Sequence, residues 1–148
     1  MLYRILRVDE TWHAGLSANN PNCITSVFDH VMNRSNSGWQ SPYISTCGSL
    51  NSVLEYRKTI HPLNARIVQI SEDNLPVVKI DLRLWSNRKN YYVRDTNNNE
   101  SIKQFNIFAK ENEVVLLVGY VPDTHVQLME ETDFDCSQLP VGMLANLA

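Results

Sequence analysis

The most apolar stretch of the chain is the segment EVVLLVGYVP at residues 113 to 122. Its apolar run has the length of a strand and is rich in valine, which favours extended backbone. Gly119 predicts a bulge or bend near the end of this strand. We therefore expect the segment to be the central strand of a strand-rich core.

Shorter segments elsewhere carry strand and helix patterns in alternation. Further strands are predicted at residues 2–8, 42–47, 66–70, 76–83 and 125–129. The last of these is expected to return antiparallel to the strand at 113–122. Helices are predicted at residues 9–14, at 25–33, and from a cap at Ser49 to about Arg57. Ser26 followed by Asp29 resembles a capping box for the second helix.

This pattern indicates an α+β fold with a strand-rich core and short helices. Its 148 residues fit a single domain spanning 1–148, long enough to bury a core without disulfides or metals. Residues 86–99 are expected to form a polar, mobile insertion. Residues 130–148 lack a clear pattern and are expected to be an irregular tail.

Charge and cysteine content narrow the function classes. The net charge of −3, from 13 basic and 16 acidic residues, argues against a broad basic surface for nucleic acid. It leaves open a nucleic acid that is only a substrate. The 3 cysteines are too few and too scattered for a disulfide framework or a zinc site, and no other metal-ligand spacing is present. An odd cysteine count fits a reducing compartment.

Membrane and secretion signals are not expected. No window reaches the ~18 apolar residues that a membrane-spanning helix needs. Arg4 and Arg7 lie close to the N-terminus without a long apolar core after them, so a signal peptide is not predicted. We therefore expect a cytoplasmic protein, or an effector that acts inside a target cell.

The segment SPYISTCGSL at residues 41 to 50 is unusual for a core strand. After Tyr43 and Ile44 a core strand would continue with large apolar side chains. Here it continues with Ser45, Thr46 and Cys47, which are small and carry hydroxyl or thiol groups. We interpret this as a strand with a ligand, rather than a core, lying over it.

Other residues with chemical potential stand in a fixed order around this strand. Arg4 lies in the first strand, His30 on a helix, and Glu111 and Glu113 just before the most apolar strand. Taken singly, each has an ordinary explanation. Arg4 could be a surface arginine on an edge strand, His30 a histidine at the edge of the core, and the two glutamates a solvated turn.

In this order the motifs resemble the arginine–serine–glutamate class of mono-ADP-ribosyltransferases, the cholera-toxin-like enzymes. The matching pieces run from residue 2 to residue 122 and comprise Leu2-Tyr3-Arg4, Gly15-Leu16, Asp29-His30, Gly38-Trp39, Tyr43-Ile44-Ser45-Thr46-Cys47, Leu50, Glu111-Asn112-Glu113-Val114, Gly119 and Pro122. One departure is Cys47, which stands where the family's motif ends in a serine and is a poorer hydrogen-bonding group.

The resemblance implies a split core of two small antiparallel sheets with short flanking helices around an NAD cleft. It implies that Glu113 stabilises the oxocarbenium-like transition state of nicotinamide–ribose cleavage and that Glu111, pointing the same way along an extended segment, orients or deprotonates the acceptor. Ser45 would hold Glu113 and line the cleft, and Thr46 would support the strand beside the cofactor. Arg4 and His30 would bind the phosphates and the adenosine side of NAD. No metal is implied.

The sequence does not decide which acceptor would receive the ADP-ribose. Glu111-x-Glu113 resembles the arginine-specific members, which favours a protein arginine. A nucleobase of DNA or RNA, or water in an NAD glycohydrolase, would need the same NAD chemistry. A fourth possibility is an inactive domain that binds NAD or a protein partner. The two glutamates weigh against it, because a binding module has no need of two carboxylates beside a cleft.

Overall fold

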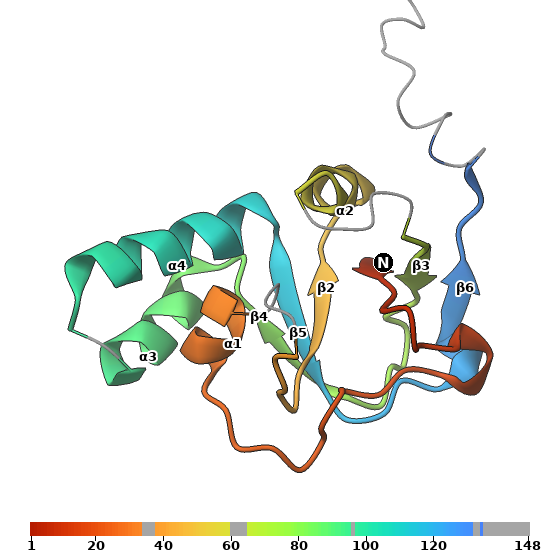
Figure 1. Ribbon diagram of the computed structural model, residues 1–148, viewed down its shortest axis with the longest axis horizontal. Coiled ribbons are helices and arrows are strands. Elements are labelled where there is room, and N and C mark those ends of the chain that lie inside the picture. The colour runs from red at the N-terminus through yellow and green to blue at the C-terminus, as the bar shows by residue number, and fades with distance from the viewer. Residues whose placement is uncertain (34–37, 60–64, 96, 132–133, 135–148) are drawn as a thin grey trace, which may run out of the picture.

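The computed structural model of the chain describes residues 1–33, 38–59, 65–95, 97–131 and 134. Within these ranges it contains six strands and four α-helices (Figure 1). The strands are β1 (Leu2–Ile5), β2 (Ile44–Cys47), β3 (Ile67–Ile70), β4 (Val78–Asp81), β5 (Val114–Val118) and β6 (Val126–Leu128). The helices are α1 (Val27–Asn33), α2 (Leu50–Arg57), α3 (Trp85–Asp95) and α4 (Asn99–Glu111), with 3-10 turns η1 (Trp12–Ala14) and η2 (Asp123–His125).

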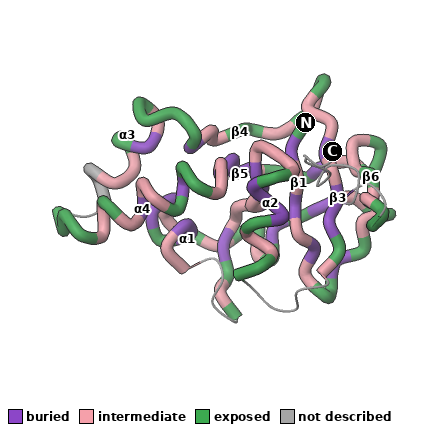
Figure 2. The backbone as a smooth tube through the Cα atoms, turned by 90° about the horizontal axis from the view of Figure 1, so that it is seen from above, coloured by how far each residue is buried: buried purple, intermediate pink, exposed green. Residues whose placement is uncertain are grey.

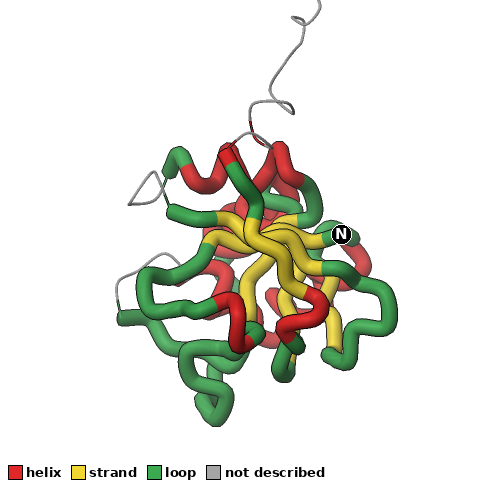
Figure 3. The backbone as a smooth tube through the Cα atoms, turned by 90° about the vertical axis from the view of Figure 1, so that its right-hand side faces the viewer, coloured by secondary structure: helices red, strands yellow, loops and turns green. Residues whose placement is uncertain are grey.

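The strands form one antiparallel sheet in the order β4-β5-β2-β1-β3-β6. This confirms the α+β class and the strand-rich core, but the two small sheets that were expected are joined into one. The join is narrow. The pairs β2–β5 and β1–β3 are each in register over four residues, whereas β1 and β2 meet at the single pair Tyr3↔Cys47. Figure 3 shows the twisted strands crossing the middle of the molecule.

One face of the sheet carries a continuous apolar core. Because side chains alternate along a strand, even-numbered residues of β1 and β3 share this face with odd-numbered residues of β5. Its buried members include Leu2, Val68, Ile70, Val115 and Leu117. Figure 2 shows the buried residues concentrated along the strands.

The other face carries two separate apolar clusters, one on each half of the sheet. The first lies on β5 beneath α1, α3 and α4, and includes Phe28, Phe105, Val114 and Leu116. The second lies on β1 and β3 beneath α2. Its buried members are Cys47, Val53, Leu54, Ile67 and Phe134. Strand β2 runs between the two clusters and contributes Cys47 to the second one, and α2 lies near the end of β2 (Figure 1).

Most predicted elements are present, with shorter bounds. The Ser49 cap of α2 is confirmed, since its side chain accepts the backbone N–H of Ser52. The capping role of Ser26 is confirmed too, because its hydroxyl accepts from the N–H of Asp29 at 3.0 Å. Gly119 has a φ of 125°, which fits the predicted bend. The helix predicted at residues 9–14 is only the 3-10 turn η1.

Two predictions were wrong. Residues 86–99 are not a polar insertion but most of α3 and the start of α4. Their helices pack on an apolar cluster and are also joined by polar contacts that an apolar pattern does not reveal. Buried Arg88 on α3 donates to Asn106 on α4 at 2.7 Å, and Asn98 caps α4. Strand β6 pairs with β3 and not with β5, because η2 carries the chain to the opposite edge of the sheet. Of the predicted tail, residues 132–133 and 135–148 lie outside the described residues.

Candidate functional site

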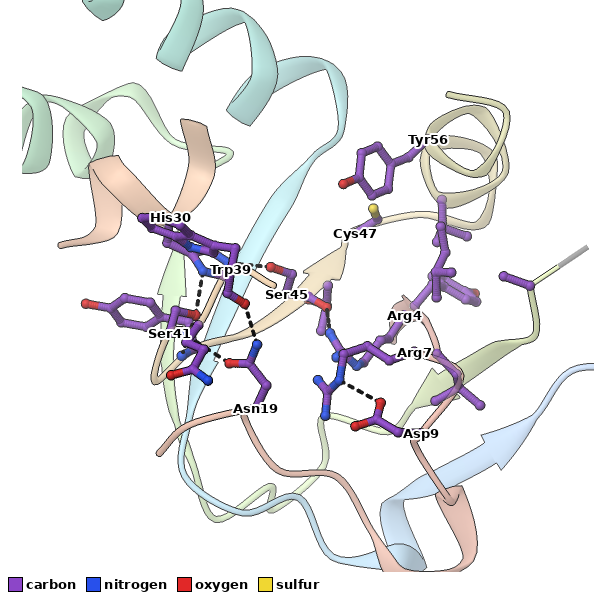
Figure 4. A pocket seen from close by; sticks show the side chains of 18 of the residues that line it. Arg4, Arg7, Asp9, Asn19, His30, Trp39, Ser41, Ser45, Cys47 and Tyr56 are labelled. Carbon is purple, nitrogen blue, oxygen red and sulfur yellow. Dashed lines mark hydrogen bonds and ion pairs between the residues drawn. The ribbon is translucent and has the colours of Figure 1, made fainter. Parts of the chain in front are cut away.

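A cleft of about 700 Å³ opens on the helical face of the sheet, where β1 and β2 diverge (Figure 4). Ser45 and Cys47 on β2 and Tyr3 on β1 line the cleft. His30 on α1 bounds one side, and Tyr56 on α2 bounds the other. This volume is in the range of small-molecule and cofactor sites. The small side chains of Ser45 and Cys47 therefore face a cleft, and Cys47 also packs against α2.

Arg4 is a buried clamp between three segments. Its side chain is 8% exposed, and all three guanidinium nitrogens donate hydrogen bonds. Nε and Nη2 donate to the two carboxylate oxygens of Glu10 at 3.2 and 3.0 Å, and Nη1 donates to the backbone carbonyl of Ser45 at 2.8 Å. Arg4 thus ties β1 to the strand that bears the hydroxyls, at the point where the sheet is narrowest.

His30 and Ser45 form the polar centre of the cleft. The imidazole is buried, and its Nε2 lies 2.5 Å from Oγ of Ser45. Its Nδ1 lies 2.6 Å from Oγ of Ser41, and Tyr43 packs edge-on against the ring. In a neutral imidazole one nitrogen donates and the other accepts, and each hydroxyl can take either role. The structure thus brings His30 and Ser45, two of the predicted site residues, together at the cleft.

Thr46 has a structural role on the opposite side of β2. Its hydroxyl donates to the backbone carbonyl of Val115 at 2.6 Å, and the residue is buried. This agrees with the expected support of the strand. Its hydroxyl is committed to the neighbouring strand, although Thr46 contributes to the wall of the cleft.

Glu113 directly precedes β5 and lies opposite Gly48, the residue that follows β2. It is not among the residues that line the cleft. Its backbone carbonyl accepts from the N–H of Gly48 at 2.8 Å, and its carboxylate accepts from the hydroxyl of Ser49 at 2.6 Å. The prediction that Ser45 holds Glu113 was therefore wrong. The register Cys47↔Val114 sets Glu113 opposite Gly48, three residues beyond Ser45.

Glu113 also has an uncommon backbone conformation. Its φ is 47°, in the left-handed region that non-glycine residues rarely adopt. Such residues cluster at functional sites, where the surrounding structure holds a conformation that costs about 1–3 kcal/mol. The conformation follows α4: the N–H of Glu113 donates to the carbonyl of Lys110 at the end of that helix.

Glu111 is the exposed last residue of α4. The expected extended segment, with both carboxylates pointing the same way, was therefore wrong. The helix continues to Glu111, and the turn at Asn112 separates the two glutamates. A spacing of two residues in the sequence does not distinguish a strand from the end of a helix.

An ion pair lies beside Glu113. Arg83 donates to both carboxylate oxygens of Asp81, at 2.8 and 2.7 Å. These hydrogen bonds lower the pKa of Asp81 and raise the pKa of Arg83, to which the charge of Glu113 adds a smaller contribution. Gly48 leaves room for this side chain, since a Cβ there would lie 2.7 Å from Nη1 of Arg83.

Three residues of the site were not predicted from the sequence. Ser41 holds the second nitrogen of His30. Arg7 lines the cleft beside Asp9.

Trp39 lines the cleft with an indole N–H that is buried and has no acceptor among the described residues. Its carbonyl accepts from Asn19 at 2.5 Å, which anchors this loop. The Gly38-Trp39 pair was part of the family resemblance and so marked this loop in the sequence. No sequence motif marked Ser41 or Arg7 as site residues.

Within the ranges that the structure describes, no cluster of three or more histidine, cysteine, aspartate or glutamate residues is arranged to hold a metal. No helix in those ranges has the length and apolar character needed to cross a membrane. Comparison of the chain with protein family models, curated protein sequences and solved structures finds no match. What the site could do is inferred from its own residues.

Proposed function

We propose that the protein is an NAD-dependent mono-ADP-ribosyltransferase with a protein arginine as acceptor. The observation that carries the proposal is that Arg4, His30 and Ser45, from three separate segments, meet in one hydrogen-bonded network at a cleft of about 700 Å³. These are three of the residues on which the resemblance to the cholera-toxin-like enzymes rests. Each has an ordinary explanation alone, but their convergence at a cleft of ligand size is not expected of unrelated surface residues.

In the proposed reaction the bond between the ribose and nicotinamide breaks, and neutral nicotinamide leaves with the bonding electrons. The ribose carbon becomes cationic and is captured by a guanidinium nitrogen of the acceptor, which loses one proton. His30 and Ser45 would hold NAD in the cleft. Glu113 does not line the cleft but is held to Gly48, the residue after the cleft residue Cys47, so it would act on a ribose that extends past Cys47 and stabilise its positive charge electrostatically.

Two observations support a functional role for Glu113. The residue keeps a left-handed backbone that a glycine or asparagine would adopt at lower cost. Its carboxylate is fixed by Ser49, and its backbone is fixed to Gly48, the residue after the cleft residue Cys47. A solvated turn would need neither contact. Glu111, exposed at the end of α4, is the candidate for activating the acceptor.

Product analysis tests this proposal. The purified protein would be incubated with NAD, with and without agmatine, a small guanidino acceptor, and the products separated by mass spectrometry. ADP-ribosyl-agmatine is the expected product. Free ADP-ribose at the same rate with or without agmatine would point to a glycohydrolase or to an untested nucleobase acceptor. If NAD is not consumed with or without agmatine, the proposed transferase activity is overturned.

A further inference from the structure

The cleft has two arginines, and only one of them is available to a ligand. Arg4 is 7% exposed and uses its guanidinium on Glu10 and Ser45. Glu10 is itself buried, so the charge of Arg4 is matched inside the protein. A ligand phosphate could reach Arg4 only by breaking contacts that join β1 to β2.

Arg7 is more exposed than Arg4 and its guanidinium makes weaker contacts, although Glu10 lies near both arginines. Its side chain is 34% exposed and lines the cleft (Figure 4). Its one close side-chain partner is Asp9, which accepts from Nε at 3.1 Å and is itself 71% exposed. The carboxylate of Glu10 lies farther away, 3.7 Å from Nη1. An exposed pair of this kind contributes little stability, so the guanidinium can exchange Asp9 for another anion at small cost.

Among the described residues that line the cleft, Arg4 and Arg7 are the only arginine or lysine side chains. We propose that Arg7, and not Arg4, binds a phosphate of the ligand, and that Asp9 is the counter-ion which the phosphate displaces. The ligand class is a nucleoside diphosphate or a dinucleotide. A guanidinium binds phosphate oxygens through paired N–H donors, which a carboxylate partner occupies in the same way. This inference rests on the proposed NAD site and names the residue that recognises its diphosphate.

Two ligands that differ only in phosphate isolate this contact. ADP and adenosine would be titrated into the protein, and binding followed by the indole N–H resonances, because Trp39 lines the same cleft. The variants would be Arg7→Gln, Arg7→Lys and Asp9→Asn. Arg66→Gln is the matched control, since Arg66 is an exposed arginine that packs on Trp12 and does not line the cleft.

Arg7→Gln is expected to weaken ADP binding at least about tenfold and to change adenosine binding less than about twofold. Arg7→Lys should give an intermediate loss, because an ammonium keeps the charge without the paired donors. Asp9→Asn should strengthen ADP binding about two- to fivefold by removing the competing carboxylate. The control should match the wild type with both ligands.

Equal ADP affinity in Arg7→Gln and the wild type would overturn the role of Arg7 and leave the NAD site standing. Equal losses for ADP and adenosine would also overturn it, because they would mark Arg7 as a structural residue. Asp9→Asn tests the pair without altering the arginine, and weaker ADP binding in that variant would contradict the displacement. Absence of binding of either ligand to the wild type would overturn the proposed NAD site itself.

Discussion

The hydroxyl of Ser49 donates to Oε2 of Glu113 at 2.6 Å, while its oxygen accepts the backbone N–H of Ser52 at 3.1 Å. One hydroxyl thus caps helix α2 and holds the proposed catalytic carboxylate. The cap orients the donor, so the helix that bounds the cleft also fixes Glu113.

Ser49→Ala removes both the cap and the contact with Glu113, and a control variant at another helix cap separates the two effects. Loss of the cap should lower the free energy of unfolding by about 0.5–2 kcal/mol in urea denaturation. Release of the carboxylate should reduce nicotinamide release from NAD about tenfold. The matched control is Asn98→Ala, which removes the cap of α4 at the end of that helix opposite to Glu111. If both variants lose the same stability and neither loses activity, Ser49 does not position Glu113.

Replacing Arg4 tests the clamp at the narrow join of the sheet. Arg4→Gln would leave the buried carboxylate of Glu10 without its main partner, and breaking a buried pair typically costs about 3–5 kcal/mol. Urea denaturation should show a loss of that size. Lys58→Gln removes an exposed pair with Glu55 and should change stability by less than about 0.5 kcal/mol. Similar losses in the two variants would contradict the clamp.

The Asp81–Arg83 pair predicts a pH dependence of stability. Hydrogen bonds from Arg83 lower the pKa of Asp81 in the folded state, so the ionised form adds stability above the unfolded pKa. That stability is lost as the pH falls through the lower, folded value. Asp81→Asn should therefore be less stable than the wild type at pH 7, by less than about 1 kcal/mol because the pair is partly exposed.

The gap between Asp81→Asn and the wild type should begin to close as the pH falls through ~3.9, the ordinary pKa of an aspartate, and narrow further toward the lower pKa of the folded state. Urea denaturation at pH 7 and at pH 3 measures both values. Arg83→Gln breaks the same pair from the other side and should show the same closing gap. A difference that is constant with pH would contradict the assignment.

Gly48→Ala tests the packing around Glu113. A Cβ at Gly48 would lie 2.9 Å from Cδ of Arg83 and 3.3 Å from Cβ of Glu113. Moving these side chains should cost about 1–3 kcal/mol of stability. The double variant with Arg83→Ala should recover much of that loss, which a double-mutant cycle would detect as coupling. Additive effects would mean that Arg83 does not fill the space over Gly48.

The sequence was a good guide to the strands. Apolar patterns located β3 and β5, and the hydroxyl-rich end of β2 indicated a strand that the structure places at a cleft. The partner of Glu113 could not be predicted, because it depends on the register between β2 and β5. Helix α3 was missed because its inward contacts are polar and aromatic, with Arg88 buried and Tyr91 and Tyr92 packed on the cluster around Phe105.

The central claim is that Glu113 supports cleavage of the nicotinamide–ribose bond. The most direct test is the rate of nicotinamide release from NAD by the wild type and by Glu113→Gln, which keeps the size of the side chain. Glu55→Gln, an exposed glutamate on α2, is the matched control. We predict that Glu113→Gln loses at least about a hundredfold in rate, while NAD affinity and folding are retained and the control matches the wild type. Equal rates in Glu113→Gln and the wild type would contradict the account.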